Sequence, residues 1–379
     1  MKYDAITLDT TIFYKNSFQF NRGMLDQLTQ FKNGTIEFVL SDIVQREVQK
    51  ALCNQAMEAH DAIDKAIKLS NKSGLLSTAA EMQKIYDGVK NPKDIANDRF
   101  REFISNTGAI IIGSSLASMD ELLKLYFNAE PPFEETGRKK NEFPDAIALL
   151  SLESWAKSNT KKILVISEDA GWAAFAESSE WIDVEKDLAL ALQKLQKHAE
   201  QAERLVELLL RDLAEGKRES ILNEITEAIE QSVLDMEVLP EATADYYYEA
   251  DRVQLEYKNF KFICKNNRFD FKITQIGKDR IVAKIAILIT IDAKCDFSFS
   301  TWDSVDKEYV GMGTGSAETE VEFREAILLT IEGDLTAEPP DIEISEIELI
   351  DKVRSVDFGE VGLDYDEDDY EEDPHDFHH

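Results

Sequence analysis

Four acidic residues stand in sequence contexts from which they could bind one metal ion together. They are Asp9 in "ITLDTTIF", Glu47 in "IVQREV", Asp145 in "EFPDAIAL" and Asp169 in "VISEDAGW". Asp9 and Asp169 follow apolar runs that predict buried strands, whereas Glu47 lies in the second turn of a predicted helix and Asp145 opens another. In open α/β sheets, ligands bind beyond the carboxyl ends of the strands. We therefore expect the four carboxylates to meet at one end of a sheet.

A shared site of this kind favours a particular chemistry. Carboxylates placed together repel one another and raise each other's pKa unless a cation neutralises them. Carboxylate oxygens prefer a hard cation, so the predicted cofactor is Mg²⁺ or Mn²⁺. Such a metal binds a phosphate oxygen, lowers the pKa of a bound water and stabilises the leaving oxygen. The site therefore suits phosphodiester hydrolysis without a protein nucleophile.

Each acid also has a structural explanation on its own. Aspartate after proline is common at a helix start, Asp9 could cap a turn, and Glu47 could lie on a solvated helix face. Glu168 and Asp169 could simply begin a loop. The joint arrangement indicates a site because independent surface acids have little reason to occupy three sheet-end positions and a helix start.

Other phosphate chemistries fit the sequence less well. Enzymes that form an aspartyl-phosphate need a second aspartate two residues after the first, where this chain has Thr11. The segment "GMGTGS" at Gly311 is expected between two strands of a β domain, whereas a phosphate-binding loop precedes a helix. The five histidines lie outside the predicted site, so a histidine-based hydrolase has little support.

A cationic triplet, Arg138, Lys139 and Lys140, precedes Asp145 in "GRKKNEFPDA". The formal charge of −33 argues against broad nucleic-acid binding, because phosphate affinity normally comes from Lys and Arg. Any contact with nucleic acid must then be local or metal-assisted, and the triplet could supply it beside the predicted metal ligands. The alternative is a solvated basic loop.

The first 185 residues alternate apolar runs with amphipathic stretches, which predicts a parallel sheet covered by helices on both faces. The predicted strands lack polar alternation, as doubly covered strands should. They span residues 5–8, 36–40, 109–112 and 163–167, with a weaker fifth at 181–184. Most of residues 42–126 is predicted helical. A second helical run extends from 184 to about 233, broken only near Gly216.

Beyond Tyr246 the hydrophobic residues alternate with period two, as in "FDFKITQI" and "RIVAKIAILITI", which predicts an antiparallel β-rich domain. The predicted organisation is a first domain over 1–185, a helical linker region over 186–245, the β-rich domain over 246–360 and an acidic tail over 361–379. The tail has nine acids and no Lys or Arg between Asp364 and Asp376, so we expect it to be disordered.

Length and composition agree with more than one domain. The chain has 379 residues, of which 43% are hydrophobic, and this exceeds what one core usually organises. Cys53, Cys264 and Cys295 are odd in number and far apart, so neither a disulfide framework nor a zinc site is predicted. No secretory signal or membrane-spanning apolar run is visible. We expect a cytoplasmic protein without a membrane partner.

The four acidic motifs, in this order, resemble the acidic quartet of the PIN-domain ribonucleases. More narrowly, "PPFEETGRKKNEFPDA", "WIDVEKDL" and the helical, then β-rich remainder resemble the large bacterial PIN-like proteins of unassigned role. The resemblance covers about residues 1 to 185. It implies a metal-dependent nuclease, commonly acting on RNA, with a PIN-like parallel sheet of order 3-2-1-4-5.

The last motif departs from the family pattern, which in many members is threonine-x-aspartate. This chain has Ser167, Glu168 and Asp169. Serine can take the hydrogen-bonding role of the threonine, so the resemblance places the ligand at Asp169 and keeps Glu168 as an alternate. Glu142, one helical turn before Asp145, is a further candidate carboxylate.

The resulting hypothesis is a bacterial PIN-like nuclease, preferring RNA to DNA, in which Asp9, Glu47, Asp145 and Asp169 bind Mg²⁺ or Mn²⁺ and carry catalysis. Arg138, Lys139 and Lys140 would bind the substrate. A role in defence or stress follows from analogy alone. One alternative is a catalytically silent PIN-like scaffold whose β-rich domain binds a protein partner or a second copy. Another is a nuclease for DNA or structured RNA.

Overall fold

The structure is a computed structural model that describes residues 2–73, 84, 91–134, 142–196, 199–277, 279–334, 341–350 and 355–364. The chain divides into two compact units: Met1–Ala199 with Lys272–Gly277, and Glu200–Phe271 with Lys278–His379. The basic triplet 138–140 and the acidic tail beyond Asp364 lie outside the described residues. The predictions made for these two segments therefore stay predictions.

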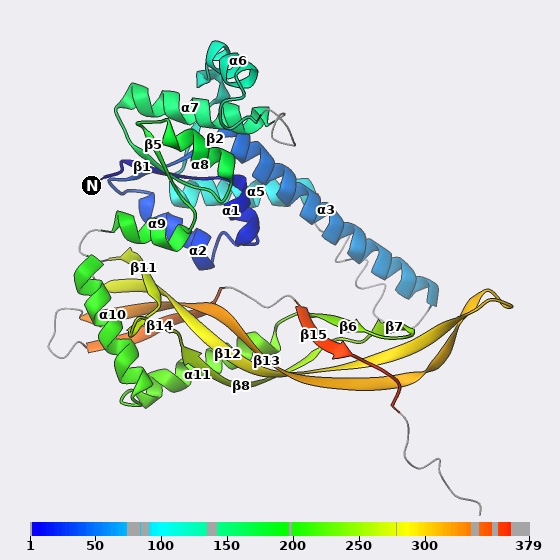
Figure 1. Cartoon of the computed structure of the whole chain (residues 1–379). Helices are drawn as coiled ribbons and strands as arrows, with labels where there is room; N and C mark the ends of the chain where they lie inside the picture. The colour runs from blue at the N-terminus through cyan, green and yellow to red at the C-terminus, as the bar shows by residue number, and fades with distance from the viewer. Residues whose placement is uncertain are drawn as a thin grey trace, which may run out of the picture. The chain divides into compact units, whose positions relative to one another are not determined.

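The first unit is built on a five-stranded parallel sheet of order β3-β2-β1-β4-β5 (Figure 1). Its strands are β1 (Ala5–Leu8), β2 (Glu37–Ser41), β3 (Ile110–Ile112), β4 (Ile163–Ile166) and β5 (Ile182–Glu185). The strand β1 pairs in parallel with both β2 and β4. All residues of β1 and β4 are buried, as expected for strands covered on both faces. The predicted order is confirmed, and each strand lies within one residue of its predicted bounds.

Helices and short turns connect these strands. They are α1 (Thr10–Lys15), α2 (Gly23–Asp26), η1 (Gln27–Phe31), α3 (Asp42–Ser73), α5 (Pro92–Thr107), η2 (Ser114–Leu116), α6 (Met119–Phe127), α7 (Phe143–Asn159), α8 (Ala170–Glu177) and α9 (Leu188–Leu195). The start and end of α5 follow ordinary signals: Asn91 accepts from the backbone N–H of Lys93 over 2.9 Å, Pro92 occupies the first turn, and Gly108 ends the helix with φ 69°.

An aromatic cluster fixes α1 and α5 against the sheet. Phe13 of α1 packs edge-on against Phe103 of α5 with ring centroids 5.9 Å apart, and Phe38 of β2 lies 6.1 Å from the same ring. Phe20 stacks on Phe103 at 4.6 Å. Burying each such side chain contributes about 1.5–3 kcal/mol. The helix α1, which begins directly after β1, is therefore held in place by the packing of Phe13 against α5.

The predicted helical run from 184 to Gly216 is wrong at Gln196. The helix α9 ends there, and the backbone of Gln196 is extended with φ −77° and ψ 138°. The side-chain Nε2 donates to the carbonyl of Thr274 over 3.0 Å, and the N–H of Ile276 donates to Oε1 over 3.2 Å. These bonds to a distant strand satisfy the amide and hold the residue outside the helix, which the local helical pattern could not reveal.

The second unit combines two helices with strands that pair mainly antiparallel, which confirms the predicted antiparallel β-rich sheet. Its elements are α10 (Ala199–Ala214), α11 (Glu219–Leu234), β6 (Leu239–Thr243), β7 (Tyr247–Ala250), β8 (Gln254–Phe262), β9 (Cys264–Lys265), β10 (Arg268–Phe269), β12 (Arg280–Asp303), β13 (Glu308–Asp334), β14 (Asp341–Leu349) and β15 (Ser355–Glu360), while β11 (Phe271–Ile276) precedes β12. The dominant feature is a long twisted hairpin of β12 and β13, 24 and 27 residues in length (Figure 1). The strands β7 and β8 pair with β12, and β14 pairs with β13.

The segment "GMGTGS" does not lie between strands, which corrects the expectation for it. Gly311 and its neighbours belong to β13, where Gly311 pairs with Ser300 and Gly313 with Phe299. A Cβ atom on Gly315 would come within 2.0 Å of the carbonyl oxygen of Gly362, so the later chain crosses the strand at backbone contact distance. Glycine is required here for close approach, which is a recognised exception to its low strand propensity.

No helix among the described residues has the length and apolar character needed to cross a membrane.

Candidate functional site

Asp9 lies at the carboxyl end of β1, the central strand of the parallel sheet. Its backbone N–H donates to the carbonyl of Ile166 over 2.9 Å, which continues the pairing of β1 with β4 past Leu8. The residue is only 5% exposed. Thr11 Oγ1 donates to Asp9 Oδ2 over 2.6 Å, and Ser167 Oγ donates to the same oxygen over 2.9 Å. These two hydroxyls fix the orientation of the carboxylate.

Asp169 follows β4, the neighbour of β1, and caps helix α8. Its Oδ1 accepts from the backbone N–H of Gly171 over 2.5 Å and of Trp172 over 3.3 Å. Its own N–H donates to Ser167 Oγ over 3.0 Å. Ser167 thus connects the backbone of Asp169 with the carboxylate of Asp9, which is the hydrogen-bonding role expected of a hydroxyl at this position.

Glu47 lies in the second turn of α3, the helix that begins directly after β2. Thr10 Oγ1 donates to Glu47 Oε2 over 2.5 Å. The adjacent Thr11 bonds to Asp9 instead, so two neighbouring hydroxyls hold carboxylates from two different elements. Thr10, the residue after Asp9, therefore helps to hold the Glu47 carboxylate in place.

Asp145 lies in the first turn of α7, and its pKa is raised from 3.8 to about 7. Burial is the largest cause, because it removes solvation from the charged form. The negative charges of Asp9, Glu47 and Glu142 raise the pKa further, whereas a hydrogen bond from the Trp172 side chain lowers it. Asp145 is therefore partly protonated near neutral pH.

The pKa of Asp9 is also raised, and again burial is the largest cause. The charge of Asp169 adds to the effect, whereas the hydrogen bonds from Thr11, Ser167 and the backbone of Thr10 oppose it. Asp145 thus interacts with Asp9 and Glu47, and Asp9 interacts with Asp169. The structure brings the four acids, hereafter the acidic quartet, into one electrostatically coupled group.

The two further candidate carboxylates differ in their surroundings. Glu168 is exposed and forms an ion pair with Lys15, the last residue of α1. Glu142 precedes α7, and its charge acts on Asp145. Glu142 is therefore electrostatically part of the site, whereas Glu168 is held by a cation outside the acidic quartet.

The donor chemistry of the acidic quartet fits a hard divalent cation, because it offers carboxylate oxygens whose mutual repulsion a cation would relieve. As the side chains stand, no three Asp, Glu, His or Cys residues in the described part of the chain are arranged to hold a metal ion. Glu47 is bonded to Thr10, and Asp169 caps α8. Binding an ion would require these side chains to change partners.

Three groups that support the acidic quartet, Thr10, Thr11 and Trp172, are not among its predicted residues. For Thr10 and Thr11 the sequence carries a signal, because "LDTTIF" places two adjacent hydroxyls directly after a strand-end aspartate. Trp172 is a core residue that is only 1% exposed. Its additional hydrogen bond to Asp145 had no local signal, because the two residues lie on different helices.

The fold and the acidic quartet define the class of this first unit: a parallel α/β domain with a carboxylate site beyond the carboxyl ends of its strands. Comparison with known proteins supplies the family. Residues 6–172 match a family model described as a PIN domain, so the chain is a PIN-domain protein over these residues. No curated protein and no solved structure matches the chain. The resemblance predicted from the four motifs is confirmed. PIN domains are typically metal-dependent nucleases that use divalent ions such as Mg²⁺ or Mn²⁺.

Proposed function

We propose that the protein is a divalent-metal-dependent endoribonuclease. In this proposal Asp9, Glu47, Asp145 and Asp169 hold Mg²⁺ or Mn²⁺. The observation that supports it most directly is the pKa of about 7 at Asp145, raised by burial and by the charges of Asp9 and Glu47. A group of partly buried carboxylates that repel one another is a functional-site candidate with a stated physical cause.

The bound metal would supply a polarised phosphate oxygen and an activated water. The chain's own residues prepare the site. Thr11 and Ser167 both donate to Oδ2 of Asp9 and so fix the orientation of its carboxylate. The Trp172 side chain also donates a hydrogen bond to Asp145. We assign substrate phosphate contacts to Arg138, Lys139 and Lys140, supported by their place in the sequence just before α7.

Incubation of the purified protein with labelled single-stranded RNA, duplex RNA, single-stranded DNA and duplex DNA tests this function. Each substrate is given Mn²⁺, Mg²⁺ or EDTA. The expected result is internal cleavage of single-stranded RNA that requires metal. The Asp145→Asn variant, purified in parallel, controls for contaminating nucleases. Cleavage confined to DNA or duplex RNA would replace the substrate assignment, and no cleavage of any substrate would favour the scaffold alternative.

A metal-binding measurement separates these outcomes further. Titration of Mn²⁺ into the wild type should give saturable binding by calorimetry, which Asp9→Asn weakens. Metal binding without cleavage would mean that the site is assembled but the substrate is different. The cytoplasmic location and the setting of bacterial defence or stress belong to the same proposal and are supported by analogy alone.

A further inference from the structure

The distal part of the β12–β13 hairpin has one buried and one solvent-facing side. Along β12, the residues Cys295, Phe297 and Phe299 are buried, while Lys294, Asp296, Ser298 and Trp302 on the alternate positions are exposed. The register extends this alternation to the paired strands β7, β8 and β13. We call the solvent-facing side between Thr290 and Trp302, with its cross-strand partners, the outer face.

Three aromatic rings gather at the distal end of the outer face. Trp302 pairs directly with Tyr309, and their ring centroids are 5.2 Å apart. Tyr247 lies 4.9 Å from the Tyr309 ring. Tyr247 pairs with Ser300, which in turn pairs with Gly311, and the small size of these two residues leaves room for the Tyr247 and Tyr309 rings to meet. The three rings, hereafter the aromatic trio, are 53%, 56% and 54% exposed for Trp302, Tyr309 and Tyr247.

Acidic side chains cover the rest of the outer face. The row of Asp292 places Glu256 and Glu320 on its two sides, and the next rows contribute further carboxylates. Those of the outer face are Glu249, Glu256, Asp292, Asp296, Glu318, Glu320 and Glu322. Lys258 pairs with Asp292 at 2.7 Å and Glu320 at 2.8 Å, and Lys294 is exposed. Carboxylates therefore outnumber cations on this surface.

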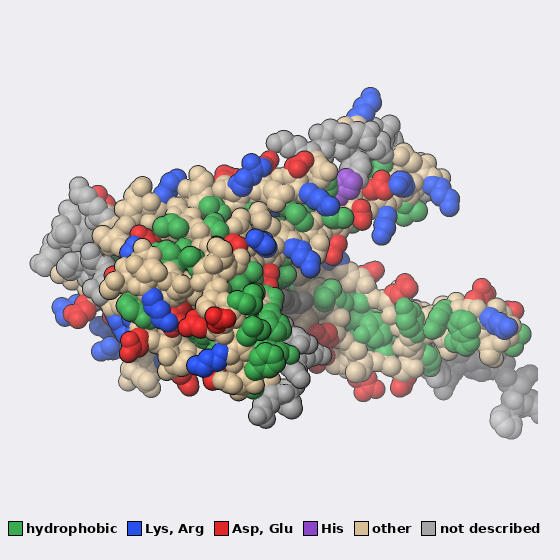
Figure 2. Space-filling model, turned by 90° about the horizontal axis from the view of Figure 1, so that it is seen from above, with side chains coloured by type: hydrophobic (Ala, Val, Ile, Leu, Met, Phe, Trp, Pro, Cys, Tyr) green, Lys and Arg blue, Asp and Glu red, His purple; other side chains and the backbone are tan. Residues whose placement is uncertain are grey.

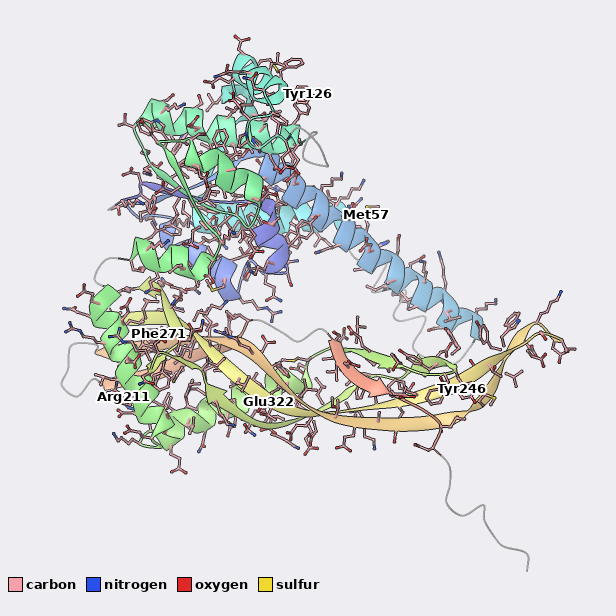
Figure 3. All side chains as sticks on the ribbon, viewed as in Figure 1. Met57, Tyr126, Arg211, Tyr246, Phe271 and Glu322 are labelled. Carbon is pink, nitrogen blue, oxygen red and sulfur yellow. The ribbon has the colours of Figure 1, made fainter. Side chains whose placement is uncertain are left out.

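Seen from above, the hairpin carries hydrophobic side chains with Asp and Glu side chains at its edges (Figure 2). Figure 3 shows Glu322 near the middle of the hairpin and Tyr246, which precedes β7, nearer its distal end. An exposed aromatic group on a strongly charged surface is typical of an interaction site.

We propose that the outer face binds a basic segment of a partner protein, with an Arg or Lys side chain on the aromatic trio and further cations opposite the carboxylates. A cation over an exposed aromatic ring is attracted by the ring's negative face. Complementary charge then fixes the register of the segment along the strands.

Charge excludes the other occupants. Nucleic acid would be repelled because its phosphates have the same sign as the face. A two-fold dimer through this face would place the same carboxylates against each other. The chain's own tail starts beside the face, since the N–H of Ser316 donates to Asp364 over 3.0 Å, but its sequence is acidic.

Fluorescence anisotropy with the full-length protein tests the proposal. The probe is a labelled decapeptide of alternating Arg and Ser, and its matched control carries Glu in place of Arg. We expect binding of the Arg peptide alone, weakened at least about 10-fold by Trp302→Ala with Tyr309→Ala and by Glu318→Lys with Glu322→Lys. Glu224→Lys with Glu227→Lys on exposed positions of α11 makes the same change in net charge and should alter affinity less than about twofold.

Several results would overturn the proposal. They are no binding by the wild type, unchanged binding by the aromatic variant, or equal loss in the α11 control, which would mean unspecific attraction. Trp302→Phe keeps a ring and should bind within about threefold of the wild type, which guards against misfolding of the alanine variant. A wild-type dimer in sedimentation that the aromatic variant loses would make a second copy the occupant instead.

Discussion

The two units use acidic side chains in opposite ways. In the first unit, carboxylates from β1, α3, α7 and the start of α8 converge, and burial with mutual repulsion raises the pKa of Asp145 to about 7. On the outer face of the second unit, Glu318, Glu320 and Glu322 are spaced two residues apart along β13 and remain exposed. The difference lies in the placement of the acids relative to solvent, because both regions are rich in them.

This contrast shows what makes a carboxylate chemically useful. An exposed acid keeps its hydration and interacts weakly with its neighbours through water. A partly buried acid loses hydration, so neighbouring charges and hydrogen bonds control its protonation and its affinity for a cation. The partly buried arrangement suits metal binding, whereas the exposed arrangement suits the attraction of a charged partner over a wide area.

The largest expected effect tests the contrast directly through activity. Asp9→Asn and Asp145→Asn should each lower kcat at least about 100-fold, since each removes a proposed metal ligand from the reacting centre. Initial rates of RNA cleavage with Mn²⁺ measure it. The matched variants Glu318→Gln and Glu322→Gln on the outer face should remain within about twofold of the wild type. A rate near that of the wild type for either aspartate variant would refute the assignment.

The basic triplet should affect binding more than chemistry. Replacing Arg138, Lys139 and Lys140 by Ala should raise KM about 10-fold with little change in kcat, because contacts outside the reacting centre act through binding. Measurement of affinity at several salt concentrations should also show a flatter salt dependence, since fewer counterions are released. A salt dependence equal to that of the wild type would indicate that the triplet is a solvated loop without a role in binding.

Asp145 should also make the metal-free protein less stable as pH rises. Its pKa is about 7 in the folded state against an ordinary value of 3.8, so between these values the folded state holds a proton that the unfolded state has lost. Stability from this group is therefore present below pH 3.8 and is lost as pH rises through about 7.

Asp145→Asn removes this loss. The whole shift corresponds to about 4 kcal/mol, but Asp145 is partly exposed, so we expect the variant to be more stable by about 1–2 kcal/mol at pH 8. Urea unfolding in EDTA at pH 5 and pH 8, followed for the first unit, measures the difference. The advantage of the variant should shrink at pH 5, and an advantage that is independent of pH would contradict the electrostatic cause.

The smallest effect concerns Glu168, which the family pattern left as an alternate ligand. Because it is exposed and paired with Lys15, Glu168→Gln should change the cleavage rate less than about threefold. A loss comparable to that of Asp9→Asn would move the ligand from Asp169 to Glu168.

The sequence predicts the parallel sheet well because its central strands β1 and β4 are short, apolar and fully buried. Ala5 to Leu8 needs no distant information to be recognised as a strand. Gln196 could not be predicted as a helix end, since the bonds that hold it come from Thr274 and Ile276, far along the chain. Likewise, the glycine-rich segment of β13 resembles a loop in sequence, and the reason for Gly315 is its close contact with Gly362, far along the chain.

The same limit applies to the candidate site. The expectation that Asp9, Glu47, Asp145 and Asp169 lie together comes from their positions at strand ends and near helix starts. The hydroxyl of Thr10 and the side chain of Trp172 complete the arrangement through contacts between separate elements, which no local pattern encodes.

Because the pKa of Asp145 is about 7, metal binding at the acidic quartet should exchange a proton for the cation. A divalent cation that binds there must displace this proton, because a carboxylate ligand has to be deprotonated. Apparent metal affinity should therefore fall as the solution becomes more acidic, and loading at neutral pH should release a fraction of a proton into the buffer. Calorimetry in two buffers of different ionisation enthalpy would count that release.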